Sequence, residues 1–74
     1  MIEMERILTK NTIGRKVRSF RLKKGISQDR LSKLVDLSLN TIVKVESGRN
    51  PNPTIETLLR IARILDVQVN DLIK

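Results

Sequence analysis

The sequence predicts a single all-α domain of five short helices. Apolar residues recur at intervals of three and four along most of the chain, which is the spacing of one helix face. Gly, Ser, Thr, Asn and Pro, which favour helix ends and turns, separate these periodic segments. The length of 74 residues allows one domain, since common domain sizes are about 100–150 residues.

The first periodic segment predicts a helix that starts near residue 13 and ends at Gly25. Three apolar residues share one side of it: Ile13, Val17 and Phe20. Asn11 or Thr12 offers an N-cap, and Gly25 suits the left-handed position after a helix. Residues 1–10 lack a clear period and are compatible with an arm, a strand or an early helical turn. We therefore expect an N-terminal arm at 1–11 and a folded domain at 12–74.

Two short helices are predicted at 28–35 and 39–47. Ser27 and Ser38 stand directly before them as N-caps. The connection of three residues gives the dimensions of a helix-turn-helix at about 28–47. Leu31, Leu34 and Val35 form the apolar face of the first helix. The run at 41–45 is rich in β-branched residues and resembles a strand, but the chain offers no second credible strand to satisfy its backbone.

A helical wheel of residues 39–47 separates an inner from an outer side. The inner side holds Leu39, Ile42, Val45 and Glu46. The outer side holds Asn40, Thr41, Val43 and Lys44. The outer set has the chemistry of a major-groove reader, because Asn can bond adenine, Lys can donate to guanine, and methyl groups can meet thymine.

The rest of the chain predicts a loop at 48–53 and two more helices. Thr54 caps the first of these, whose apolar stripe is Ile55, Leu58, Ile61, Ala62 and Leu65. A last short helix is predicted at about 69–74, and its apolar residues are Leu72 and Ile73.

Composition excludes several classes of function. The chain has no Cys and no His, so it lacks thiolate and imidazole ligands and the usual general base. Phe20 is the only aromatic residue, which leaves little for stacking on single-stranded bases. We expect no enzyme, no cofactor, no small-molecule ligand and no membrane association. The net charge of +7 favours a polyanionic partner, and residues 1–24 alone carry eight basic and two acidic side chains.

Motif residues recur along most of the chain. They fall in three runs: Ile13-Gly14-x-x-Val17-Arg18-x-x-Arg21-x-x-Lys24-Gly25-x-Ser27-Gln28-x-x-Leu31, Ser38-x-x-x-Ile42-x-x-x-Glu46-x-Gly48-x-x-Pro51, and Thr57-Leu58-x-x-Ile61-Ala62-x-x-Leu65-x-Val67. This pattern closely resembles the Xre/Cro phage-repressor family of helix-turn-helix DNA-binding domains, over about residues 12–74. Two positions depart from it, since the family commonly has Ala at Ser32 and Gly at Asp36.

The resemblance implies a compact five-helix, lambda-repressor-like fold with the helix at 39–47 in the major groove. It implies base contacts from Leu39, Asn40, Thr41 and Lys44. It implies DNA backbone contacts from Ser27, Gln28, Ser38, Arg49 and Asn50. Gln28 would also brace the recognition helix, and Arg21 and Glu46 would form a partly buried ion pair.

The function that we expect is a sequence-specific double-stranded DNA-binding regulator, a repressor, in the cytoplasm of a prokaryotic or phage-type system and associated with the nucleoid. The partner would be a palindromic operator, bound by a homodimer that forms at least on DNA. Val69, Leu72 and Ile73 are candidates for the dimer surface, and the arm is the alternative. An antitoxin-like or controller protein whose main contact is another protein, through the arm, Leu22 and the C-terminal residues, is the second hypothesis.

Overall fold

The computed structural model describes residues 2–50 and 52–73, with side chains from residue 12 onward. Within these ranges the chain forms five helices and no strand, as the sequence predicts. The helices are α1 (Ile2–Lys24), α2 (Gln28–Val35), α3 (Leu39–Ser47), α4 (Ile55–Leu65) and α5 (Val69–Ile73). Met1, Lys74 and the loop residue Pro51 lie outside the described residues.

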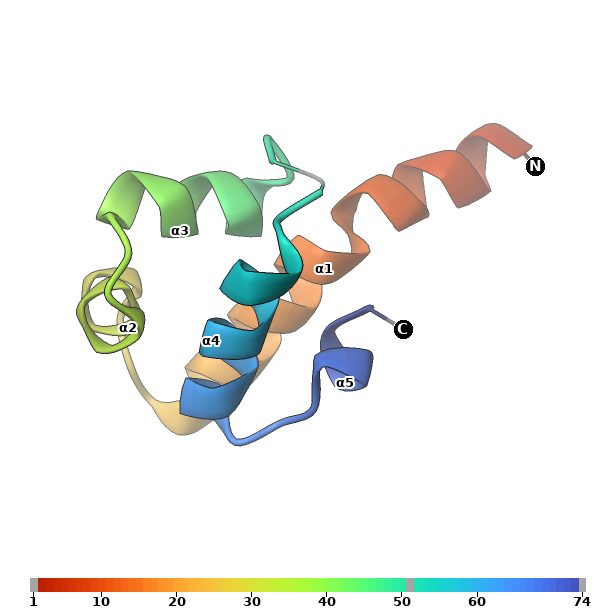
Figure 1. Cartoon of the computed structure of the whole chain (residues 1–74). Helices are drawn as coiled ribbons and strands as arrows, with labels where there is room; N and C mark the ends of the chain where they lie inside the picture. The colour runs from red at the N-terminus through yellow and green to blue at the C-terminus, as the bar shows by residue number, and fades with distance from the viewer. Residues whose placement is uncertain (1, 51, 74) are drawn as a thin grey trace.

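The first helix is much longer than expected. α1 begins at Ile2, so the prediction of an N-cap at Asn11 or Thr12 is wrong, because the helix passes through both residues. Its N-terminal turns extend beyond the other helices (Figure 1). A helix segment that extends past its neighbours needs no apolar stripe, which accounts for the lack of a period in this part of the sequence. Its predicted end is confirmed, since Gly25 follows with a φ of 74°.

Local hydrogen bonds define where the other helices begin. The hydroxyl oxygens of Ser27, Ser38 and Thr54 accept bonds from backbone amides three residues ahead, at 3.0, 3.1 and 3.1 Å. All three predicted N-caps are therefore confirmed. α5 starts without a hydroxyl cap, but the Asp71 carboxylate accepts a bond of 2.9 Å from the amide of Gln68.

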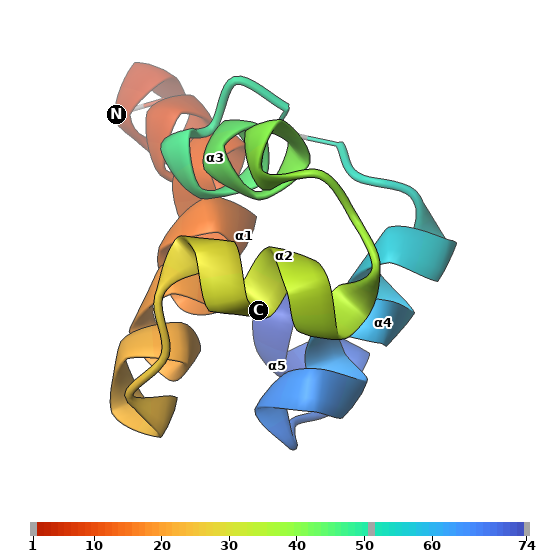
Figure 2. The ribbon, with the colours of Figure 1, turned by 90° about the vertical axis from the view of Figure 1, so that its left-hand side faces the viewer.

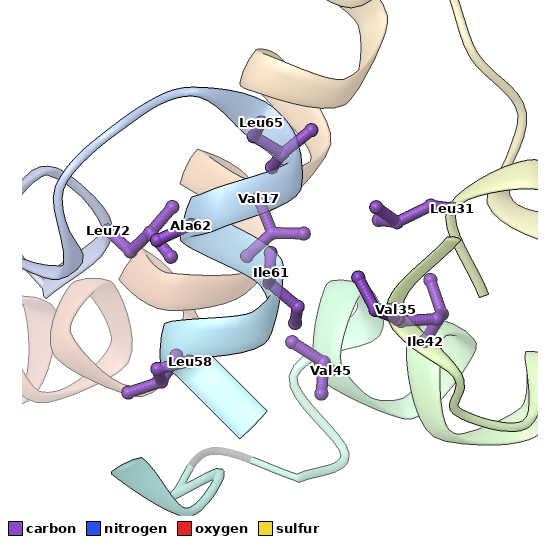
Figure 3. Close-up of a cluster of buried hydrophobic side chains, with 10 residues drawn as sticks. All are labelled: Val17, Leu31, Val35, Ile42, Val45, Leu58, Ile61, Ala62, Leu65 and Leu72. Carbon is purple, nitrogen blue, oxygen red and sulfur yellow. The ribbon is translucent and has the colours of Figure 1, made fainter. Parts of the chain in front are cut away.

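The core lies where α1, α2, α3 and α4 meet, and α5 closes one side of it (Figures 1 and 3). Its buried apolar residues are Val17, Leu31, Val35, Ile42, Val45, Leu58, Ile61, Ala62, Leu65 and Leu72. Three residues expected to face inward are instead exposed: Leu34, Leu39 and Ile55. Leu39 and Ile55 open their helices, and the first turn of a short helix projects past the elements that cover its middle.

The C-terminal helix corrects one sequence prediction. Leu72 is fully buried in the core of its own chain, so it has no surface to offer a second copy. Val69 is half-buried and Ile73 is exposed. Of the three candidates for a dimer surface, only Ile73 is therefore exposed.

The turn between α2 and α3 stores a small amount of strain. Asp36 adopts a φ of 59° and ψ of 46° at the end of α2, a left-handed conformation in which its amide bonds the carbonyl of Lys33. Glycine adopts this region without steric cost.

We expect Asp36→Gly to raise the free energy of unfolding by about 0.5 kcal/mol, because relief of the left-handed strain exceeds the entropy gained by the unfolded chain. Urea denaturation checks this. Asp66→Gly is the matched control: Asp66 has a φ of 58° but also binds Lys24 at 2.5 Å, so its gain should be smaller. A larger gain at Asp66 would contradict this account.

Candidate nucleic-acid interface

α3 lies at one edge of the helical bundle, supported from below by α1 and α2 (Figure 2). The predicted helix-turn-helix is formed by α2, the connection at 36–38 and α3. Within α3 the buried residues are Ile42, Val45 and Glu46. The opposite side of α3 is therefore free of the domain's own core.

The residues expected to contact bases lie along that open side. Asn40 and Lys44 are exposed, and Leu39 is 43% exposed although the helical wheel placed it inside. Thr41 is half-buried, and its hydroxyl lies 2.8 Å from the hydroxyl of Ser38. Side chains that can donate, accept and make methyl contacts thus share one face of α3.

The inner side of α3 is anchored by a buried ion pair. Nε and Nη2 of Arg21 donate to the two carboxylate oxygens of Glu46, at 2.7 and 3.0 Å. These side chains are only 9% and 3% exposed. Nη1 of Arg21 donates to the carbonyl of Ile26 at 2.8 Å. The bidentate geometry satisfies the charge that burial would otherwise penalise, and the ion pair implied by the resemblance is present.

Gln28 completes this network from the first residue of α2. Its Nε2 donates to Oε1 of Glu46 at 3.1 Å. A carboxylate oxygen only accepts, so the amide nitrogen must point toward it. Gln28 therefore braces α3 directly. It is half-buried, and its position places it beside the free amides of the N-terminus of α2.

Gly14 has a role that the sequence reading missed. A Cβ at this position would lie 2.5 Å from the carbonyl oxygen of Val45 and 2.7 Å from that of Glu46. α1 therefore approaches the backbone at the C-terminal end of α3 more closely than any side chain would allow. A glycine inside an otherwise periodic helix was the available signal, because such a residue usually has a packing reason.

Two hydrogen bonds of Asn50, one from its backbone and one to its side chain, hold the loop after α3. The amide of Asn50 donates to the carbonyl of Lys44 at 3.0 Å, and its side-chain oxygen accepts from the amide of Asn52 at 3.3 Å. Asn50 is thus partly occupied in shaping the loop. Arg49 is exposed. Neither Lys44 nor Arg49 has a carboxylate partner among the described residues, so both retain charge for an anion.

Two other kinds of site have no support in the described parts of the chain. No group of three or more metal-ligating side chains gathers there. None of the described helices combines the length and the apolarity that crossing a bilayer requires.

Comparison with known proteins gives a consistent family. A helix-turn-helix family model matches residues 17–72. An uncharacterized HTH-type transcriptional regulator of Archaeoglobus fulgidus is 37% identical over 57 residues, covering 77% of this chain and 80% of that protein. The HTH-type transcriptional regulator SinR of Bacillus subtilis is 28% identical over 61 residues, and the match spans only 55% of SinR.

Solved structures agree with the sequence relatives. The N-terminal DNA binding domain of SinR from B. subtilis superposes with a TM-score of 0.84 at 26% identity, covering 86% of this chain and 93% of that one. The restriction-modification controller protein C.AhdI from Aeromonas hydrophila gives a TM-score of 0.80 at 30% identity, covering 85% and 94%. The all-α fold is therefore that of the lambda-repressor-like helix-turn-helix domains, and the relatives are transcription regulators rather than enzymes. The chain belongs to the Xre/Cro-type helix-turn-helix family of DNA-binding transcription regulators.

Proposed function

We propose that this protein is a sequence-specific repressor that inserts α3 into the major groove of double-stranded DNA. The observation that carries the proposal is the division of α3 into two sides. Its inner side is fixed by the Arg21–Glu46 pair and Gln28, while Asn40 and Lys44 stand exposed on the other side. A rigidly held helix with free polar side chains suits base recognition, because base contacts depend on defined geometry.

Within this proposal the residues divide by task. Asn40 bonds adenine, Lys44 donates to guanine or a phosphate, and the apolar groups of Leu39 and Thr41 contact thymine methyls. Backbone contacts come from Ser27, Gln28, Ser38, Arg49 and Asn50. The amides at the start of α2 assist Gln28 in holding a phosphate. Phosphate contacts set the register of the protein, and base contacts set the sequence.

The proposed assembly is a homodimer on a palindromic operator. α4 and α5 are in contact, and each exposes aliphatic side chains, namely Ile55 and Leu59 on α4 and Ile73 on α5. These residues replace Leu72 as candidates for a self-complementary surface. A dimer bound at a promoter excludes other proteins from that DNA, which makes repression the proposed outcome. The corresponding location is the prokaryotic cytoplasm, at the nucleoid.

Selection of bound duplexes from a random pool tests this function. We expect an enriched palindrome with half-sites about one helical turn, roughly 10 base pairs, apart. Affinity for the enriched duplex should fall steeply as salt rises. Equal affinity for every duplex in the pool would refute the sequence-specific regulator, and an enriched sequence without symmetry would refute the dimer.

We expect two substitutions to separate base from backbone recognition. Asn40→Ala should weaken binding to the enriched duplex by about 1–3 kcal/mol and relax the preference at one base position, whereas Arg49→Ala should weaken all duplexes alike. Titrations against the enriched duplex and its single-base variants measure both effects. A uniform loss at Asn40 together with a base-specific loss at Arg49 would reverse the assignment.

The second candidate is a controller-type protein whose main contact is another protein. Leu22 favours it, because this large apolar side chain on α1 is 56% exposed. The fold's similarity to C.AhdI, a restriction-modification controller protein, also supports it. DNA binding by the Lys44→Ala variant separates the two candidates: the DNA-reading proposal requires a loss of duplex affinity, whereas a protein-contact role predicts that this affinity does not change.

A further inference from the structure

α1 carries a hollow surface whose charges the DNA-binding proposal does not use. The hollow measures about 300 Å³, and we call it the basic groove. It is lined by Arg15, Lys16, Ser19, Phe20 and Lys23. Three of these five side chains are cationic and none is acidic, so the groove carries a concentrated positive charge.

The basic groove faces away from the recognition helix. Gly14 and Arg21 mark the side of α1 that packs against α3, since Gly14 meets the α3 backbone and Arg21 binds Glu46. At about 100° per residue, the groove-lining residues centre on nearly the opposite side of α1. A straight duplex that contacts α3 is therefore separated from the groove by the body of α1.

The cations of the groove have no anionic partner among the side chains that the structure describes. Residues 12–24 contain six basic residues and no acidic one. Arg21 is paired with Glu46 and Lys24 with Asp66. No ion pair among the described residues involves the three groove cations. Their charge is thus available to an external anion.

The floor of the groove adds an apolar component. Phe20 is half-buried against the core, and the Nζ atom of Lys23 lies 5.4 Å from the centroid of its ring. This cation–π contact holds the ammonium group over the ring and lowers the entropy that Lys23 loses on binding. The groove therefore combines positioned positive charge with an aromatic surface.

We propose that the basic groove docks an acidic peptide segment of a partner protein, with an apolar side chain flanked by carboxylates. The carboxylates would pair with Arg15, Lys16 and Lys23, and the apolar side chain would pack on Phe20. Electrostatic complementarity selects such a segment, and the apolar contact adds affinity. This second surface goes beyond the DNA-reading function, because a partner can occupy it while α3 holds a duplex.

Fluorescence anisotropy of the full chain with a fluorescein-labelled Glu-Asp-Leu-Glu-Asp peptide tests the proposal. The triple variant Arg15→Gln, Lys16→Gln, Lys23→Gln should weaken peptide binding about tenfold, the loss expected from three exposed ion pairs together. The matched control Lys33→Gln, Arg60→Gln, Arg63→Gln removes the same charge from α2 and α4, and should stay within about twofold of the wild type. Equal losses in both variants, or no peptide binding by the wild type, would overturn the groove as a docking site.

A second experiment, in which DNA duplex is added, separates this inference from the DNA-reading function. Added duplex should form a ternary complex with the protein and the peptide. Lys44→Ala should lower the affinity of the protein for the duplex and leave its affinity for the peptide unchanged. Displacement of the peptide by duplex would overturn the proposal, because it would make the groove a DNA backbone contact. The substituted side chains are exposed, except for Lys16 and Arg60, which are half-buried, and circular dichroism melting verifies that the variants fold.

Discussion

Glu46→Ala is expected to lower the free energy of unfolding by about 3–5 kcal/mol, because it leaves the guanidinium of Arg21 buried without its carboxylate. Arg21 donates two hydrogen bonds to Glu46, at 2.7 and 3.0 Å, and Gln28 donates a third. A 74-residue domain has a total stability of about 4–11 kcal/mol. The loss is therefore a large fraction of the total stability, and it would unfold a domain whose stability lies at the low end of this range. Urea denaturation followed by circular dichroism measures the loss.

Two controls separate burial of the charge from loss of the contact itself. Lys33→Ala breaks the exposed pair with Asp29, whose side chains are 70% and 58% exposed, and should change stability by less than about 0.5 kcal/mol. The double variant Arg21→Met with Glu46→Leu removes both charges and should recover much of the lost stability. If Glu46→Ala lost no more than Lys33→Ala, the pair would not anchor α3.

Gly14→Ala should also destabilise the domain, against the usual trend for helices. In an open helix, alanine in place of glycine gains about 1 kcal/mol. Here the added methyl group would lie 2.5 and 2.7 Å from backbone oxygens of α3, which cannot rotate away as a side chain can. We expect a net loss of about 1–3 kcal/mol from this overpacking. Thermal unfolding measures it.

The same substitution links packing to recognition, because α3 must move to accommodate the methyl group. We expect a loss of about tenfold in affinity for the enriched duplex, the cost of misplacing one good base contact. This second result depends on the proposed function, whereas the stability loss does not. Ser19→Ala, on the outer side of α1, is the matched control and should gain about 0.5 kcal/mol with unchanged duplex affinity. A gain in stability at position 14 would show that α1 and α3 are not in close contact.

Local chemistry explains why most helix boundaries were predictable. The caps Ser27, Ser38 and Thr54 bond amides only three residues away. The start of each of these helices can therefore be predicted from a few neighbouring residues. The left-handed Gly25 and Asp36 likewise depend on their own backbone. The β-branched run at 41–45 is helical because α1 and α2 support α3, and tertiary packing overrides a weak propensity.

The wrong sequence predictions concern how far a helix extends and which of its residues its neighbours cover. Residues 2–11 carry no helical period in the sequence, so periodicity alone could not distinguish a helix from an arm there. Ile55 is 62% exposed although it continues the stripe of α4, because a stripe does not say where the neighbouring helices stop. Leu72 is in the core although α5 has only five residues, too few to define a face. Gly14 had a visible signal, but its partner in α3 lies far along the chain.

The two-sided construction of α3 has a consequence for evolution. Ile42, Val45 and Glu46 maintain the fold, while Asn40 and Lys44 touch nothing that the core needs. Exposed substitutions away from caps and buried networks usually change stability by less than about 0.5 kcal/mol. New side chains at positions 40 and 44 can therefore accumulate almost neutrally. A gene duplicate of this domain could acquire a different target sequence in a few steps without passing through an unfolded intermediate.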